Sequence, residues 1–554
     1  MQRGTVISLA VLVLPAACGG DKAAGPAAPT CSSALASQLT LAVGAYVSID
    51  PATNGGCVTF PANASVDSDE YVLVPQSAAG TFNQSSPFQL RTATLAATAM
   101  PAAPRGTAGS SRATAVQFDG MLRALGRARS SAAAAALRAA RAAGALRPLA
   151  TPPVVGSVRG FAVCSALDCT TFKNVGARAR IVGQHVAIYV DTLAPGGGLD
   201  SAHMDTLKQV FDTLLYPLDT TAFGSVSDLD GNGVVIALMT PVVNSLVPKT
   251  SCSSGFIAGF FFPNDLNLSA PTSQSNHGEI FYSIVADPNG TLSCAHTSGE
   301  VDSLTPGTFV HEFQHMINFA AQVRLGGPGE EGWLDEGLSK YAEELAGEKY
   351  LNLTPPDRGT FSLYAFNDVD DAYKYLSATG ASPLLIEFDQ GTLAEVGASW
   401  LFTRYLVDQF GDSLPKKLAQ TSLVGSANVA AQTGHRFDST LTHWALANWV
   451  SDSVAPGFVT PPELRYTTWH FRSRTFLSLY QQDSSRYPHP YPLVPPVSAG
   501  SAVQLNGTLR SGSGMYWRAI QAPGAPAFTL LFSGSGGAAL PAAVVPRLSV
   551  IRIR

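Results

Sequence analysis

The stretch VHEFQHMINF (residues 310–319) places two histidines four positions apart, with a glutamate directly after the first. With 10 histidines and 40 acidic residues in 554 positions, about 0.01 such His-acid-x-x-His matches are expected by chance. Phe309, Phe313 and Ala320 recur at helical spacing, which predicts a helix with one face in the core. The helix is expected to begin at Thr305, because threonine followed by proline is typical of a helix start.

The two histidines of this helix are candidate metal ligands. Side chains four positions apart lie on the same side of a helix, about 6 Å from one another. His311 and His315 can therefore bind one tetrahedral ion, for which zinc is the usual choice. Glu312 lies about 100° further round the helix. It cannot share the ion with the histidines, but it can reach a water on the metal.

The stretch GWLDEGLSKYAEELAG (residues 332–347) is the candidate source of a third ligand. Its leucines recur at helical spacing, which predicts a second packed helix. A catalytic zinc site has three protein ligands and one open position. Glu336 follows the histidine pair across a glycine-rich connection that is long enough for an antiparallel turn. Glu343, two turns further on, shares its face and could orient a ligand.

Together the two stretches form the pattern H-E-x-x-H followed by W-x-x-E-G-x-S-x-Y, which resembles the gluzincin metallopeptidases. More narrowly, it resembles the hyicolysin-type neutral zinc peptidases. The matching residues are His311, Glu312, His315, Trp333, Glu336, Gly337, Ser339 and Tyr341. The specific motifs cover 228–344, and the resemblance is expected to extend over about 180–450.

The resemblance implies a zincin fold, with a mixed sheet, an active-site helix bearing the histidine pair, and a largely helical lower half. It implies His311, His315 and Glu336 as zinc ligands. It also implies hydrolysis of peptide bonds by a zinc-activated water, with Glu312 as the general base.

Two parts of the implied site are left open by the sequence. Related gluzincins stabilise the oxyanion with a downstream His or Tyr, and no motif chooses among His435, His443, Tyr373 and Tyr375. Lys340 stands where some gluzincins have an aspartate that supports the first histidine. The support must therefore differ here, and Glu343 is the candidate.

A second candidate ion site is SDLDGNGVV (residues 227–235). Asp228, Asp230 and Asn232 alternate before a glycine, as in the first half of a calcium loop. The glutamate that would complete such a loop is absent, because Met239 holds that position. The same letters also make a good tight turn into a strand, so turn and calcium site both remain open. The hyicolysin-type resemblance includes a similar stretch.

The composition excludes several classes of protein. Apolar residues make up 46% of the chain and charged residues 14%, which is unlike a disordered chain. A net charge of -5 provides no basic patch for nucleic acid. The length leaves room for roughly three domains.

The first residues are typical of an export signal. Arg3 precedes a short apolar run, and small residues before Cys18 resemble a bacterial lipobox, in which the cysteine is lipidated. We expect a signal peptide at 1–17 and an anchor linker at 18–30. The protein would then be secreted or lipid-anchored in the cell envelope, with no other contact to a membrane.

The cysteines support an oxidising compartment. Apart from Cys18, six remain in three neighbourhoods, and the pairs expected from proximity are Cys31–Cys57, Cys164–Cys169 and Cys252–Cys294. Free buried thiols are the alternative.

The rest of the chain divides by composition. Short β-prone runs predict a β module at 31–95, and a second at 485–554. Between them lie an Ala/Arg-rich segment at 96–150 and a metallopeptidase domain at 151–480. The Ala/Arg-rich segment is expected to be an exposed helical linker, with a propeptide as the alternative.

The predicted fold is thus α+β, a zincin-like catalytic domain flanked by small all-β modules. The predicted function is that of a secreted or lipid-anchored zinc metalloendopeptidase acting on proteins or peptides. A cell-surface binding or adhesive protein with a zincin scaffold is one alternative, and a zinc hydrolase of non-peptide substrates is another. Zinc is the expected cofactor, with calcium as a second ion if residues 228–232 bind one.

Overall fold

The computed structural model describes residues 31, 37–95, 114–144, 151–386, 391–453 and 456–554. The expected signal peptide, the anchor linker and Cys18 lie outside these residues. Within the described ranges, the helices lack the combination of length and apolar character that a membrane crossing needs.

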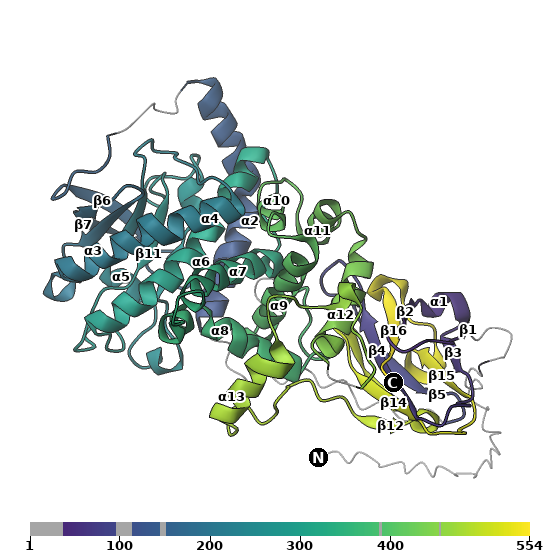
Figure 1. Ribbon diagram of the computed structural model, residues 1–554. Helices are drawn as coiled ribbons and strands as arrows, with labels where there is room; N and C mark the ends of the chain where they lie inside the picture. Colours follow the sequence, from purple (N-terminus) through teal and green to yellow (C-terminus); the bar gives the residue numbers. More distant parts are fainter. Residues whose placement is uncertain (1–30, 32–36, 96–113, 145–150, 387–390, 454–455) are drawn as a thin grey trace, which may run out of the picture.

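One half of the elongated molecule is built on a six-stranded mixed sheet, in the order β10-β11-β9-β8-β7-β6 (Figure 1). Strands β8, β9 and β11 are parallel, and the others run antiparallel to their neighbours. The central strands β8 and β9 are buried along their whole length, as their unbroken apolar sequences predict. The strands are β6 (Val158–Cys164), β7 (Phe172–Val182), β8 (Val186–Asp191), β9 (Val235–Met239), β10 (Gly259–Phe261) and β11 (Ile280–Ser283).

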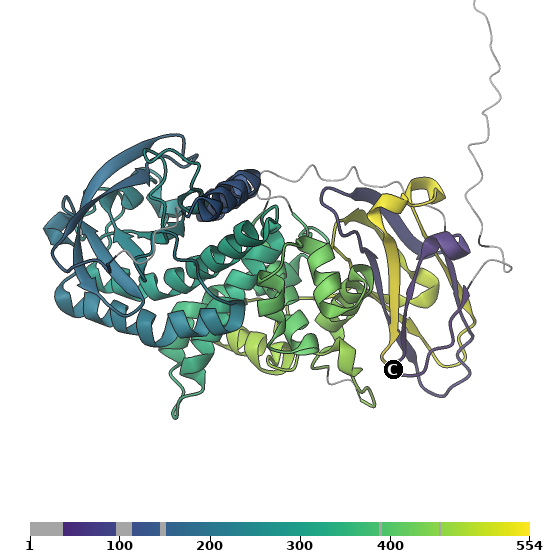
Figure 2. The same cartoon turned by 90° about the horizontal axis from the view of Figure 1, so that it is seen from above.

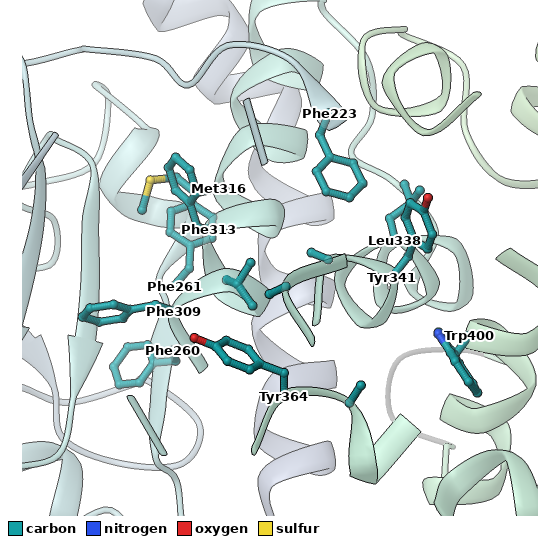
Figure 3. Packing of buried hydrophobic residues seen from close by; sticks show 14 of the residues in the cluster. Phe223, Phe260, Phe261, Phe309, Phe313, Met316, Leu338, Tyr341, Tyr364 and Trp400 are labelled. Carbon is teal, nitrogen blue, oxygen red and sulfur yellow. The ribbon is translucent and has the colours of Figure 1, made fainter. Parts of the chain in front are cut away.

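The histidine pair lies on α6 (Ser298–Leu325), which packs between this sheet and the helical part of the chain. Phe309 meets Phe281 of β11 edge to face at 4.2 Å, and Phe313 lies 5.3 Å from Phe211. Figure 3 shows these α6 side chains on the sheet side, with Leu338 and Tyr341 of α7 (Gly332–Leu351) on the other. The apolar stripe read from the sequence is therefore the face that fixes α6 to the sheet.

Helix α6 begins earlier than expected. Its N-cap is Thr297, whose hydroxyl accepts from the backbone N–H of Glu300 while the Glu300 carboxylate accepts from that of Thr297. This capping box is a strong start signal. Pro306 lies inside the helix, so the expected start at Thr305 is wrong.

The remaining helices form the second layer of this half and the middle of the molecule. Helices α3 and α4 pack beside α6, and α7, α8 and α9 pack on one another. Their bounds are α3 (Ser201–Val210), α4 (Tyr216–Phe223), α5 (Pro241–Asn244), α8 (Arg358–Ser377), α9 (Leu393–Phe410), α10 (Leu414–Ala419), α11 (Gly425–Thr433), α12 (Phe437–Val450) and α13 (Phe476–Gln482). The fold is therefore mixed α+β, with a helical part that follows the sheet in sequence.

The two expected β modules are combined in one β-sandwich at the other end of the molecule (Figure 1). One sheet has the order β1-β3-β15-β5-β13 and the other β12-β14-β4-β16-β2, so each contains strands from both ends of the chain. A single sheet must bury its apolar face against a second layer, and neither terminal segment has enough strands to build both layers. The strands are β1 (Ser37–Gln38), β2 (Tyr46–Ile49), β3 (Cys57–Phe60), β4 (Asp69–Ser77), β5 (Ser85–Thr92), β12 (Val497–Ala499), β13 (Gln504–Arg510), β14 (Trp517–Gln521), β15 (Phe528–Ser533) and β16 (Pro546–Arg552), with the short helix α1 (Pro51–Asn54).

The Ala/Arg-rich segment contains a long helix, α2 (Thr114–Ala142), that is not exposed on all sides. Viewed from above, it lies against the helices and the sheet of the first half (Figure 2). Its buried face recurs every four residues at Phe118, Leu122, Gly126 and Ser130 and continues through small residues. The expectation of an exposed linker does not hold for this helix. Small side chains carry little hydrophobic signal, yet they permit close helix packing.

All three expected disulfide pairs are formed: Cys31–Cys57, Cys164–Cys169 and Cys252–Cys294. The first lies in the sandwich and the other two in the half that contains the mixed sheet. Each pair therefore stays within one part of the molecule.

Candidate metal centre

The three predicted metal ligands converge between α6 and α7. The Nε2 atoms of His311 and His315 are 3.2 Å apart. Oε2 of Glu336 lies 3.6 Å from Nε2 of His311, and its Oε1 lies 3.5 Å from Nε2 of His315. The helical spacing on α6 and the turn into α7 thus bring all three groups to one point.

This geometry fits a zinc ion. With Zn–N and Zn–O distances of about 2.0–2.1 Å in a tetrahedron, neighbouring ligand atoms should be roughly 3.3 Å apart. Glu336 Oε1 is buried and finds no hydrogen-bond donor among the described residues. Burial and the nearby Asp119 carboxylate raise the pKa of Glu336 well above its usual range. A cation bound between the three ligands would give Glu336 Oε1 a partner and would favour the charged form of its carboxylate.

Both histidines are held from behind by carboxylates. Nδ1 of His311 lies 2.7 Å from Oε1 of Glu343, and Nδ1 of His315 lies 3.0 Å from Oδ2 of Asp335. A carboxylate at Nδ1 fixes the tautomer that leaves Nε2 free to bind metal. Glu343 therefore lies where the sequence suggested. Asp335 was missed, although its position beside Glu336 in the motif is a usable signal.

Glu312 lies beside the metal group and faces strand β10. Its Oε2 accepts the backbone N–H of Phe261 at 2.9 Å and lies 3.4 Å from a guanidinium nitrogen of Arg123. Burial, together with the Asp119 carboxylate, raises the pKa of Glu312 even though Arg123 acts in the opposite direction. A raised pKa suits a carboxylate that must take up and release a proton near neutral pH.

The metal group has a fourth member, the carboxylate of Asp119 on α2. One oxygen of Asp119, one nitrogen of each histidine and one oxygen of Glu336 all lie within 4.8 Å of one another. Burial alone would raise the pKa of Asp119, but Arg123 holds it well below its usual range. Sequence analysis missed this residue because nothing near it in the chain marks it as a ligand.

The metal group opens into a cavity of about 440 Å³. Its walls come from α2, from β10 and the residues before it, and from helices α6 to α9. The four oxyanion candidates His435, His443, Tyr373 and Tyr375 are not among its lining residues. Tyr373, for example, donates to the backbone oxygen of His489 at 3.0 Å. Tyr364, Asn367 and Lys340 do line the cavity, and each can donate a hydrogen bond.

The second candidate ion site brings together Asp228, Asp230 and Glu279. Asn232 instead donates its amide to Asp230 at 2.8 Å and accepts from the backbone N–H of Val234. Burial raises the pKa of Glu279 to about 7. Glu279 was missed because it reaches the group across the sheet from just before β11, which no local pattern reveals.

Comparison with known proteins gives one partial relative. No family model matches the chain. Over 219 residues the chain is 28% identical to the neutral metalloprotease ShpI of Staphylococcus hyicus, a stretch that covers 39% of this chain. The chain spans less than half of that relative, 44% of its length. The resemblance to neutral metallopeptidases that the motifs suggest is thereby confirmed, for part of the chain.

Proposed function

We propose that the protein is a zinc metalloendopeptidase with a zincin-type catalytic unit. One observation carries the proposal: His311, His315 and Glu336 converge at zinc-ligand distances beside the buried Glu312. His311, Glu312 and Glu336 line a cavity. The partial similarity to a neutral metalloprotease supports the same chemistry.

In this proposal the two histidines and Glu336 would hold the ion, with Glu343 and Asp335 fixing the histidine rings. A zinc ion bound there would polarise the scissile carbonyl and lower the pKa of water. Glu312 is the proton carrier: it accepts a proton from the attacking water and returns it to the leaving amine. Tyr364, Asn367 and Lys340 are the candidate donors to the oxyanion, because they line the cavity.

The substrate is proposed to be an extended peptide. Strand β10 is an edge of the mixed sheet and lines the cavity beside Glu312. A sheet edge binds a peptide through main-chain hydrogen bonds, largely independently of its sequence. This arrangement would present a backbone carbonyl to the metal group.

Export is part of the proposal. Three disulfides suit an oxidising compartment outside the cytosol. A signal peptide ending before Cys18, with lipidation of that cysteine or secretion of the chain, would take it there. Mass spectrometry of the mature N-terminus tests this: a lipidated Cys18 is expected if the protein is anchored, and a shortened, unlipidated chain if it is secreted. An intact Met1 would contradict export.

Calcium binding at the second acidic group is a separate proposal. Asp228 and Asp230 supply oxygen atoms, and Glu279 supplies the carboxylate that the loop itself lacks. Thermal unfolding with and without calcium tests it, with a raised Tm expected. An unchanged Tm would leave the stretch as a turn.

The enzymatic proposal is tested by metal content and by hydrolysis of fluorescent casein. Because α2 lies over the cavity, hydrolysis is measured on the intact chain and after the chain is cut between α2 and β6. Wild type is expected to contain one zinc, and Glu312→Gln to keep it while losing at least about 100-fold in kcat. A Glu312→Gln variant with full activity would contradict the mechanism. Metal-dependent turnover of a small ester without casein hydrolysis would favour a non-peptide substrate.

A further inference from the structure

Helix α2 covers the part of the site where a substrate would bind. One wall of the cavity is formed by α2, through Ala115, Val116, Phe118, Asp119 and Gly120. Phe118 meets Phe260 of β10 edge to face at 5.2 Å. Arg123 donates to the backbone oxygen of Phe261 at 3.4 Å, on the edge of β10 that pairs with no other strand among those described. An added peptide strand would need that same oxygen.

The same helix reaches the metal group. An Asp119 oxygen lies within 4.8 Å of the ligand atoms of His311, His315 and Glu336. Asp119 is one helical turn before Arg123, whose guanidinium lies 3.1 Å from Oδ1 of Asp119. A carboxylate is an ordinary zinc ligand. Asp119 is thus placed as a fourth ligand.

Arg123 also acts on the proposed general base. Its side chain is only 3% exposed and lies 3.4 Å from Glu312. A buried guanidinium strongly favours a charged carboxylate partner, because no water is present to solvate either charge if the pair separates. Glu312 is therefore paired while α2 is in place, and a water that needs it as a base would have to compete with Arg123.

We propose that α2 is an internal inhibitor of the peptidase, with Asp119 as the fourth zinc ligand and Arg123 as the block on Glu312. The inference rests on the proposed function. Four protein ligands leave a tetrahedral ion no open position, which is typical of a closed site. The substrate carbonyl therefore cannot approach until α2 leaves.

The way α2 is attached makes its release feasible. The buried face of α2 has three large apolar side chains, Phe118, Leu122 and Leu137. Apart from Arg123, its other buried positions are the small residues Gly120, Gly126, Ser130, Ala133 and Ala134, which bury little apolar area. In the chain α2 lies between β5 of the sandwich and β6 of the mixed sheet. A cut between α2 and β6 would therefore remove one of its two covalent attachments. Strands β2 to β5 would stay in the sandwich, because they pair with β13 to β16. The chain before β6 is accessible there, since Val154 and Val155 are 68% and 60% exposed.

The test uses the full chain with a recognition sequence for a site-specific protease inserted between Thr151 and Pro152. Casein hydrolysis is measured before and after cutting for wild type, Asp119→Ala and the control Gln117→Ala. Gln117 is exposed on the same helix. Each protein is also loaded with Co²⁺ in place of zinc, because the visible absorption of cobalt reports its ligands independently of activity.

We expect cutting to raise kcat/KM of wild type at least about 100-fold, because it opens a ligand position. Uncut Asp119→Ala should be at least about tenfold more active than uncut wild type, and Gln117→Ala should equal wild type. The cobalt spectrum of uncut wild type should differ from that of Asp119→Ala, and cutting should change only proteins that retain Asp119.

Two results would overturn the inference in distinguishable ways. Uncut wild type as active as the cut protein, with a cobalt spectrum insensitive to Asp119→Ala, would overturn the inhibition and leave the peptidase proposal standing. A cobalt spectrum that depends on Asp119, with no hydrolysis in any form, would overturn the peptidase proposal and the inhibition together. Asp119 would then be the fourth ligand of a structural metal site.

Discussion

Nδ1 of His311 lies 2.7 Å from Oε1 of Glu343, and the same carboxylate oxygen accepts from Nζ of Lys340 at 2.9 Å. Lys340 occupies the position at which some gluzincins, the family that the motifs resemble, have an aspartate that supports the first histidine. The supporting carboxylate comes instead from the next turn of α7. Lys340 is itself tied to Asp368, 3.3 Å away on α8. His311 therefore still has a supporting carboxylate, and Lys340 balances the negative charge of Glu343.

Replacing Glu343 tests this support. Glu343→Gln keeps an oxygen that can accept from His311 but removes the negative charge, so the ring becomes a weaker ligand. We expect zinc affinity to fall about 10- to 100-fold, as for other outer partners of metal-binding histidines. Competition with a fluorescent chelator measures it. Glu348→Gln, on the same helix but near Arg404, is the matched control. Equal affinity for Glu343→Gln and the control would refute the role.

Replacing Glu336 and Glu312 separates ligand from base. Glu336→Gln removes a charged ligand, and we expect the zinc dissociation constant to rise roughly 1,000-fold. Glu312→Gln should change it much less, because Glu312 faces Phe261 and Arg123. The metal content after dialysis against a weak chelator distinguishes the two variants. A Glu312 variant that loses its metal as readily as the Glu336 variant would reverse the assignment.

Some residues of the site could be predicted from the sequence, and others could not. His311, Glu312, His315 and Glu336 could be predicted because helical geometry fixes their spacing on two successive helices. Asp119 could not be predicted, because it reaches the metal group from α2, a helix whose buried face is rich in small residues and gives little hydrophobic signal. The pairing of β4 with β14 and β16 was equally invisible, since contacts between the two ends of a chain leave no local periodicity.

Disulfide removal offers a comparison of two loops. Cys252–Cys294 closes a loop with a sequence separation of 42, and Cys164–Cys169 one of 5. Chain entropy in the unfolded state predicts contributions of about 4 and about 2 kcal/mol, respectively. Double alanine variants of each pair, compared by calorimetry, should show the larger fall in Tm for Cys252–Cys294. The reverse order would show that local packing, rather than loop closure, sets the contribution.

A buried carboxyl outside the site predicts a pH dependence of stability. Asp265 is fully buried, and it accepts the Tyr282 hydroxyl at 2.6 Å and the Asn276 backbone N–H at 2.6 Å. Burial raises its pKa to about 7, against about 3.9 in an unfolded chain. Between these values the folded state holds a proton that the unfolded state has released. The free energy of unfolding should therefore fall as the pH rises from about 4 to about 7, and level off above that range.

Asp265→Asn removes this proton equilibrium and keeps an oxygen for the Asn276 N–H. The variant should be less stable than wild type at pH 5, because the amide cannot accept from Tyr282 as the carboxyl does. The difference in unfolding free energy between the variant and wild type should narrow by about 3 kcal/mol at pH 8, where Asp265 of the wild type has lost its proton. Urea denaturation at the two pH values measures it. Asp67→Asn, at an exposed position of the sandwich, is the control. Its unfolding free energy should differ from that of wild type by the same amount at both pH values. A gap for Asp265→Asn that does not change with pH would mean that Asp265 is already ionised in the folded protein at pH 5.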